Sequence, residues 1–258
     1  MNVPEYNSAA WDKLVEKGNR WTQPVSPEEI ARARLGEWSV VLTEGKSVPR
    51  EWFPELRGAD VLCLASGGGQ QGPILAAAGA KVTVVDNSAK QLAQDRLVSE
   101  REGLGMTLIK ADARDLSALA DESFDLVFHP AANLFIPEIR PVWSEAFRVL
   151  RRGGILLSGV INPAFYLFSM DAQSGKEPLS VKFKLPYADA EHLPQKELKR
   201  YLAEDTPLEH SHTLTDQLGG QLEAGFHLTA MYEDYHREVA LSNYMNTYLA
   251  TRAVKPGM

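Results

Sequence analysis

A glycine-rich stretch, SGGGQQG, contains the residues of this chain that are best suited to holding a ligand. Its glycines at positions 67, 69 and 72 follow the spacing G-x-G-x-x-G, which lets a ligand approach the backbone closely and directs a helix N-terminus at anionic groups. Asp86 lies 19 residues after Gly67, at the end of the apolar run KVTVVD, where a carboxylate can accept hydrogen bonds from a ribose. The pattern fits NAD and also other adenosine-containing ligands.

Two further features favour a ligand other than a dinucleotide. Pro73 directly follows the third glycine and removes an amide donor where a pyrophosphate would need one. Asp112, in KADARDL at the end of a third apolar run, is placed to meet an exocyclic amine such as adenine N6, while the amide of Ala113 meets a ring nitrogen. An NAD-dependent oxidoreductase remains an alternative, because the glycine spacing matches it literally.

Short apolar runs alternate with helical stretches from residue 59 onward, which is typical of a parallel sheet covered by helices on both faces. The expected strands are VLCLA, KVTVVD, MTLIKAD, SFDLVFHP and ILLSGVI. The helix VWSEAFRVLRR is expected to end at Gly153 and Gly154, and the last two strands to form an antiparallel edge hairpin. The sequence therefore predicts a Rossmann-like, doubly wound α/β fold whose seven-stranded sheet is mostly parallel.

The chain is predicted to divide into a helical, Trp-rich N-terminal cap or lid over residues 1–57 and a larger domain over residues 58–258. Tyr6, Trp11 and Trp21 could close over the ligand or simply pack in the core. Residues 162–212 contain five prolines and break the alternation of strands and helices. An insertion of this length is expected to form the substrate region.

Composition narrows the class of protein. The net charge of −7 argues against a nucleic-acid partner, because binding to phosphate backbones needs a concentration of Lys and Arg. Cys63 is the single cysteine and lies in an apolar run, which predicts a buried core residue. The absence of a signal peptide or of a long apolar span predicts a cytoplasmic protein without membrane contact. His210 and His212 are expected in a solvated loop, so no metal is predicted, and the oligomeric state stays open.

Taken in order, these motifs resemble the class I S-adenosylmethionine-dependent methyltransferases, in particular the small-molecule type that includes the quinone-biosynthesis C-methyltransferases. VLCLASGGG stands where that family has V-L-D-L-G-x-G-x-G. Cys63 and Ala65 depart from the family pattern, and an alanine at position 65 predicts a backbone that avoids positive φ there. Bacterial relatives with the same LASGGGQQ loop form an uncharacterised group, so the resemblance implies a chemistry without naming a substrate.

The resemblance implies S-adenosylmethionine as cofactor, S-adenosylhomocysteine as its product and a small molecule as methyl acceptor. The residues expected at the cofactor are Ala65, Ser66, Gly67, Gly69, Gln71, Asp86, Asn87, Gln91, Asp112, Ala113 and His129. A catalytically weak S-adenosylmethionine-binding regulatory protein is a further alternative, motivated by Cys63 and Ala65.

Three residues are expected on the acceptor side. His129 ends the fourth expected strand, where ligands of open α/β sheets collect. Its imidazole could take a proton from the acceptor, or it could merely shape the pocket. Asn133 is expected either to orient the substrate or to form a loop turn, and Tyr166 either to line an apolar acceptor cavity or to pack in the core.

Overall fold

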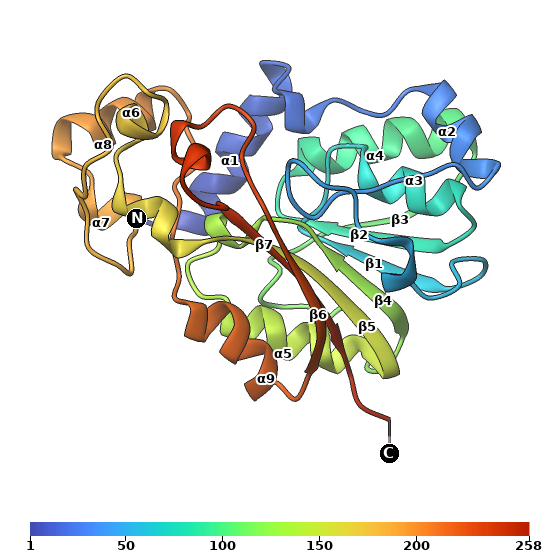
Figure 1. Cartoon of the computed structure of the whole chain (residues 1–258). Coiled ribbons are helices and arrows are strands. Elements are labelled where there is room, and N and C mark those ends of the chain that lie inside the picture. The colour runs from blue at the N-terminus through green and yellow to red at the C-terminus, as the bar shows by residue number, and fades with distance from the viewer. Residues whose placement is uncertain (258) are drawn as a thin grey trace.

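A seven-stranded sheet runs through the centre of the computed structural model, which describes residues 1–257 (Figure 1). The strand order is β3-β2-β1-β4-β5-β7-β6. The strands are β1 (Asp60–Leu64), β2 (Lys81–Asp86), β3 (Thr107–Lys110), β4 (Phe124–His129), β5 (Leu150–Ile161), β6 (His227–Asp234) and β7 (Tyr248–Val254). Strands β1 to β5 pair in parallel, whereas β7 is antiparallel to both β5 and β6. The predicted Rossmann-like fold is confirmed.

Helices cover both faces of this sheet. In Figure 1, α2, α3 and α4 lie above it and α5 and α9 below it, while α6, α7 and α8 gather beside the N-terminal helix α1. The helices are α1 (Val3–Glu16), α2 (Pro27–Arg34), α3 (Gln71–Ala77), α4 (Ala89–Glu102), α5 (Arg140–Val149), α6 (Met170–Gln173), α7 (Asp189–His192), α8 (Gln195–Ala203) and α9 (Gly220–Glu223). Within residues 1–257, no helix combines the length and apolarity that crossing a membrane requires.

The central strands are buried on both sides, because successive side chains of a strand point to opposite faces. Along β1, Val61 and Cys63 join one core cluster, whereas Leu62 and Leu64 join the other. Cys63 is fully buried, as expected, and burial raises the pKa of its thiol. The strand therefore reads as an uninterrupted apolar run rather than an alternating one.

The boundary between α5 and β5 differs from the predicted one. The helix ends at Val149 instead of at the two glycines, and β5 begins at Leu150. The pairing of β4 with β5 shifts in register between Phe124 and Leu126, opposite residues 150–155. Gly153 has φ +78° there. The two glycines therefore allow the irregular pairing at the start of β5 and do not end the helix.

The N-terminal helix α1 is anchored to the beginning of α4. The Asn87 side chain donates to the Pro4 carbonyl at 2.8 Å, and the Ser8 hydroxyl donates to the Asn87 carbonyl at 2.6 Å. Asp12 Oδ1 accepts from the Ser88 hydroxyl and from the Lys90 amide at 2.6 and 2.9 Å. These contacts hold α1 beside the carboxyl end of β2.

The same helix is joined to the insertion by one buried side chain. The Asn7 amide group donates to the Leu208 carbonyl at 2.9 Å and accepts from the Leu208 amide at 2.8 Å. It also donates to the Phe135 carbonyl at 3.0 Å. Helix α1 therefore connects residues 162–212 to the sheet, although the domain boundary at residue 57 stays a prediction.

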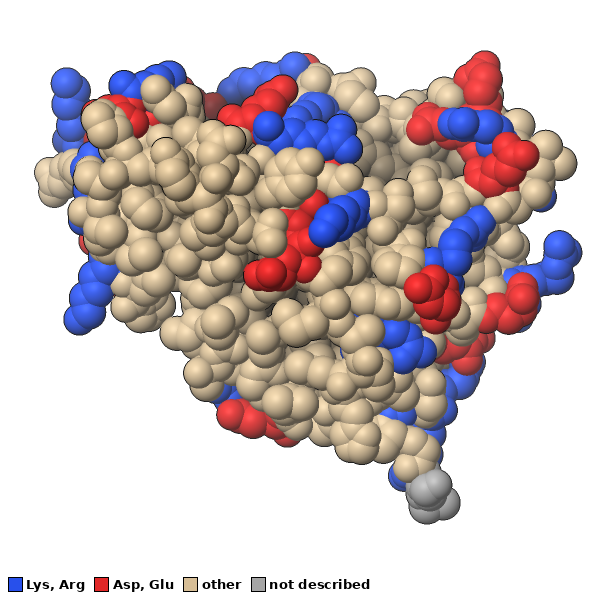
Figure 2. All heavy atoms as spheres, viewed as in Figure 1, with Lys and Arg blue, Asp and Glu red and all other residues tan. Residues whose placement is uncertain are grey.

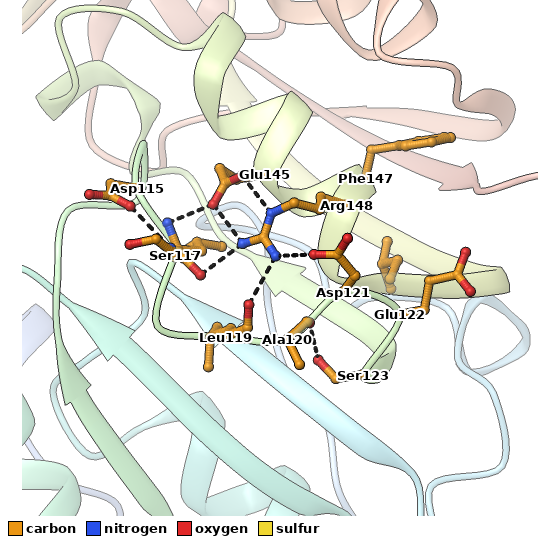
Figure 3. A network of polar contacts seen from close by, with 12 residues as sticks. Asp115, Ser117, Leu119, Ala120, Asp121, Glu122, Ser123, Glu145, Phe147 and Arg148 are labelled. Carbon is orange, nitrogen blue, oxygen red and sulfur yellow. Dashed lines mark hydrogen bonds and ion pairs between the residues drawn. The ribbon is translucent and has the colours of Figure 1, made fainter.

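The loop that follows β3 is tied to α5 by Arg148 (Figure 3). Its guanidinium donates to both Glu145 oxygens at 2.8 Å, to Asp121 Oδ1 at 2.6 Å, and to the carbonyls of Leu116 and Leu119 at 2.8 and 2.9 Å. Glu145 in turn accepts the Leu116 amide at 2.7 Å. A planar group with five donors suits this arrangement, which holds the loop carrying Asp112 against the helix layer.

Replacing Arg148 with Met should destabilise the protein by about 2 kcal/mol, because two loop carbonyls and the Glu145 carboxylate lose a charged donor. Urea unfolding followed by tryptophan fluorescence would measure the loss. Arg96→Met on the exposed face of α4 is the matched control and should stay within about 0.5 kcal/mol of the wild type. Equal losses in both variants would contradict a stabilising role for the Arg148 contacts.

Candidate active site

A cavity of about 420 Å³ opens at the carboxyl edge of the sheet. It lies where the strand order reverses between β1 and β4, the position at which open α/β sheets bind ligands. From this edge it is lined by Ala65, Ser66, Gly67, Val85, Asp86, Asn87, Ala111, Asp112, Ala113, Pro130 and Ala131. Helix α1 and residues 162–212 supply the opposite walls. The chain thus encloses one site from segments that are distant in sequence.

The glycine loop is shaped around two carboxylates. The Gly67 amide donates to Asp86 Oδ2 at 2.9 Å, and the Gly68 amide donates to Asp95 Oδ2 at 2.9 Å. A Cβ atom at Gly67 would lie 2.9 Å from the same Asp86 oxygen and 2.8 Å from the Gln91 Cβ. Position 67 therefore needs glycine for close approach, and two loop amides already donate to carboxyl oxygens.

Asp86 and Asp112 differ in their surroundings. Asp86 also accepts the Ser88 amide at 2.8 Å, and burial raises the pKa of its carboxyl despite these hydrogen bonds. Burial alone would also raise the pKa of Asp112, but the Arg114 guanidinium at 2.8 Å lowers it. Asp112 is therefore an ionised, half-buried carboxylate on the cavity wall, whereas Asp86 also organises the loop beneath.

His129 lies behind the cavity wall and does not line it. The ring is fully buried, with Nδ1 at 2.9 Å from the Leu64 carbonyl and Nε2 at 2.6 Å from Asn133 Oδ1. Asn133 in turn donates to Gln217 Oε1 at 3.0 Å and is itself 1% exposed. Burial lowers the pKa of the imidazole. The geometry favours the reading in which His129 shapes the pocket, and it gives no support to proton transfer by His129 or substrate contact by Asn133.

Comparison with known proteins identifies the family. Residues 62–158 match the model of a methyltransferase domain. An uncharacterised methyltransferase of Bacillus subtilis (strain 168), YbaJ, is 51% identical over 250 residues, which is 97% of each chain. The chain belongs to the class I S-adenosylmethionine-dependent methyltransferases. The predicted family and cofactor are thereby confirmed.

Two solved structures show the same fold at low sequence identity. An S-adenosylmethionine-dependent methyltransferase from Mesorhizobium loti is 20% identical with a TM-score of 0.58, covering 80% of this chain and 94% of its own. The [4+2]-cyclase SpnF is 16% identical with a TM-score of 0.65, covering 100% and 98%. At these identities the similarity concerns the fold alone.

The methyltransferase brings most of the predicted cofactor residues into one wall. Of the predicted cofactor residues, those that line the cavity are Ala65, Ser66, Gly67, Gln71, Asp86, Asn87, Gln91, Asp112 and Ala113. Gly69 and His129 do not line it, and neither does Tyr166, whose hydroxyl instead donates to Glu209 Oε2 at 2.8 Å. Glu209 lies on the wall and was not predicted.

Some lining residues come from the N-terminal segment. Trp11 and Trp21 line the cavity, and Trp11 packs edge-on against Phe135 at 5.1 Å between ring centroids. Tyr6 does not; its hydroxyl donates to the Thr206 carbonyl at 2.9 Å. Arg20 also lines the cavity, although it was not predicted, and it forms an ion pair with Glu44 at 2.9 Å. Single aromatic residues in a helical pattern cannot reveal which of them face a distant sheet edge.

The two predicted histidines are not solvated. His212 is 9% exposed, with Nε2 at 3.0 Å from the Asn133 carbonyl, and His210 is half-buried. The expectation of a solvated loop is wrong, because the segment packs against the turn after β4. Within residues 1–257, no group of three or more His, Cys, Asp or Glu side chains is arranged to hold a metal ion.

Asp95 is a site residue that the sequence analysis missed. It is fully buried in α4 beneath the glycine loop, and its Oδ1 has no partner within residues 1–257. Burial raises the pKa of this carboxyl to about 8. The sequence could have indicated Asp95, because it is an acid three or four residues from Gln91, Leu92 and Val98, which form the buried face of that helix.

Ala65 has φ +47°, so the prediction that its backbone avoids the left-handed region is wrong. Its amide donates to the Val85 carbonyl at 2.8 Å, which holds the chain in this conformation as it turns out of β1. A side chain here costs roughly 1 kcal/mol relative to glycine. The alanine therefore occupies a conformation that the family's usual glycine adopts easily.

Ala65→Gly should raise the free energy of unfolding by about 0.5 kcal/mol, since relief of the strain exceeds the added flexibility of the unfolded chain. Ala93→Gly, on the exposed face of α4, should instead lower it by about 1 kcal/mol. Chemical denaturation of both variants measures the two signs. A loss of stability in both would show that the φ angle at position 65 carries no strain.

Asp95→Asn should make stability less dependent on pH. A carboxyl whose pKa is raised on folding holds its proton more tightly in the folded state, so stability falls as pH rises from about 4 to about 8. The fall amounts to about 1.4 kcal/mol per pH unit at most. Denaturation at pH 5 and pH 8 should show wild type losing more than the variant. Parallel losses would place the ionisation of Asp95 outside that range.

Proposed function

We propose that the protein transfers a methyl group from S-adenosylmethionine to a small molecule bound in this cavity. The observation that supports this most directly is the chemistry of the glycine loop. Two of its amides point at the carboxylates of Asp86 and Asp95 and are not free for a pyrophosphate. A loop whose amides are taken by carboxyl groups has fewer free donors for a phosphate, and Asp86 suits a ligand that carries positive charge, such as the sulfonium and ammonium groups of the methyl donor.

The residues on the sheet edge fit the donor in chemical type. Gly67 allows close approach of its amino-acid end, Asp86 presents a carboxylate toward ribose hydroxyls, and Asp112 with the Ala113 amide presents an acceptor and a donor toward adenine. All four line the cavity. When bound, S-adenosylmethionine supplies a methyl group already activated by the positive sulfur. The protein's part is to align the acceptor and exclude water, for which α1 and residues 162–212 provide the walls.

A small acceptor is favoured by the enclosure and charge of the cavity. Its volume of about 420 Å³ lies in the range of small-molecule sites, roughly 300–1,000 Å³. The arginines in its wall, Arg20 and Arg114, are each paired with a carboxylate. With a net charge of −7, the chain is poorly suited to a polyanionic acceptor such as nucleic acid. The fold itself cannot name the acceptor.

Calorimetric titration with S-adenosylhomocysteine tests the proposal. Asp112→Ala should weaken binding about tenfold or more, the equivalent of about 1.4 kcal/mol, because the variant loses a charged acceptor. Asp115→Ala removes an exposed acid from the same loop and is the matched control, expected to bind within about twofold of wild type.

NADH serves as the competing ligand in the same experiment. We expect no heat from it, because the pyrophosphate would meet occupied amides. Clear NADH binding without S-adenosylhomocysteine binding would overturn the proposed function. Tight product binding without turnover on a broad acceptor panel would favour the regulatory alternative.

A further inference from the structure

The end of the cavity beyond β4 and β5 is walled mainly by apolar and aromatic side chains. We refer to it as the acceptor end; it comprises Ile161, Phe165, Met170, Glu209, His236 and Tyr248. The His236 ring stacks on Phe165 at 4.8 Å and on Tyr248 at 4.0 Å between centroids. Burial lowers the pKa of His236 to about 4, so this ring is neutral at physiological pH. The acceptor end is therefore an aromatic wall that contains the carboxyl group of Glu209, with the exposed Glu238, two residues after His236, also on the lining.

Glu209 is held firmly in that wall. The buried Tyr166 hydroxyl donates to Glu209 Oε2 at 2.8 Å, and the Tyr166 ring stacks on Tyr187 at 5.6 Å. The Glu209 amide donates to Asp189 Oδ2 at 2.8 Å. Within residues 1–257, Glu209 Oε1 forms neither a hydrogen bond nor an ion pair. One oxygen is thus fixed by the protein while the other remains available to a ligand in the cavity.

No cation of the cavity wall compensates this carboxylate among the residues that the structure describes. Arg20 is paired with Glu44 and Arg114 with Asp112. The nearby charge of Asp189 adds to the burial in raising the pKa of Glu209 to about 8. Without a bound cation this carboxyl group therefore tends to hold a proton at neutral pH, and an incoming cation would stabilise its ionised form.

We propose that the methyl acceptor is an apolar amine whose nitrogen binds Glu209, and that Glu209 takes the proton that frees the nitrogen lone pair. This inference rests on the proposed function. The aromatic faces of Phe165 and Tyr248 also attract an ammonium group. A carboxylate or phosphate acceptor would repel the ionised form of Glu209, and a neutral alcohol would form no ion pair with it.

The step balances with the groups named. The acceptor binds as an ammonium, and one N–H proton passes to Glu209. The freed nitrogen pair forms the N–CH₃ bond as the S–CH₃ bond breaks, with its electron pair remaining on sulfur. The methylated nitrogen regains a positive charge, and the donor becomes a neutral thioether. Tyr166 is a positioning residue here, since it touches only Glu209.

The test compares ligands that share a skeleton but differ in charge. Phenethyl, indolylethyl and n-hexyl skeletons would each be supplied as amine, alcohol and carboxylic acid, with the protein saturated by S-adenosylhomocysteine. Thermal shift and calorimetry measure binding. The amines should bind at least about tenfold more tightly than the matched alcohols, and the acids should not bind. The inference is overturned if, in every skeleton, the alcohol or the acid binds as well as the amine.

Two variants locate the effect. Glu209→Gln should lose the preference for amines while binding S-adenosylhomocysteine within about twofold of wild type, whereas Glu191→Gln on the exposed side of α7 should keep it. Unchanged amine preference in Glu209→Gln would contradict the assignment. If that variant fails to fold, two measurements still decide. One is the amine preference of Tyr166→Phe, which lacks the hydroxyl that donates to Glu209; the other is the order in which the wild type binds the amines, alcohols and acids. Failure of wild type to bind S-adenosylhomocysteine at all would instead reject the proposed function itself.

Discussion

The hydrogen bonds from the glycine loop to Asp86 and Asp95 are the constraint on which the site depends. Each of these carboxyl groups accepts one amide of the loop at 2.9 Å, so acids from β2 and α4 set the path of the loop. Both acids are positioned by the sheet and the helix packed on it. The result is a loop with two of its amides already bonded to carboxyl oxygens, which separates this site from one built for phosphate.

The rest of the cavity is formed largely by two segments outside the alternating strands and helices, namely helix α1 and residues 162–212. Helix α1 binds the start of α4 through Asp12 and the insertion through Asn7. The insertion contributes Glu209 and its support, Tyr166. Because α1 contacts both, the two additions form one continuous wall. The sheet edge, where we propose that the methyl donor binds, thus makes one side of the cavity, while the far side is made by segments outside the central sheet.

Charged side chains are arranged differently on the surface of the molecule and in the wall of the cavity. Figure 2 shows Lys and Arg interspersed with Asp and Glu along the top, in the middle and on the right of one face, and wide uncharged areas at its left and toward its bottom. Inside the cavity, both arginines are neutralised by neighbouring acids. The proposed preference for a cationic acceptor therefore depends on Glu209, which has no paired cation within residues 1–257 and lies in an apolar enclosure, where charge acts more strongly than at the surface.

The sequence by itself determined the fold, the family and most of the sheet-edge residues that line one side of the cavity. These follow from local patterns, such as apolar runs of strand length, a glycine loop and acids at strand ends. In a parallel sheet the carboxyl ends of the strands lie at one edge, so the residues that follow the strands come together there. Boundaries that depend on strand pairing were less predictable, as the irregular start of β5 shows.

Only the tertiary structure decided which polar residues face the cavity. His129 and Asn133 stand at the predicted edge, yet they point behind the wall and pair with each other. Asp95 and Glu209 carry no motif, and they matter because packing buries them beside the cavity or beneath its loop. The direction of a side chain and its loss of water arise from contacts between segments far apart in the chain. Spacing along one segment cannot encode them.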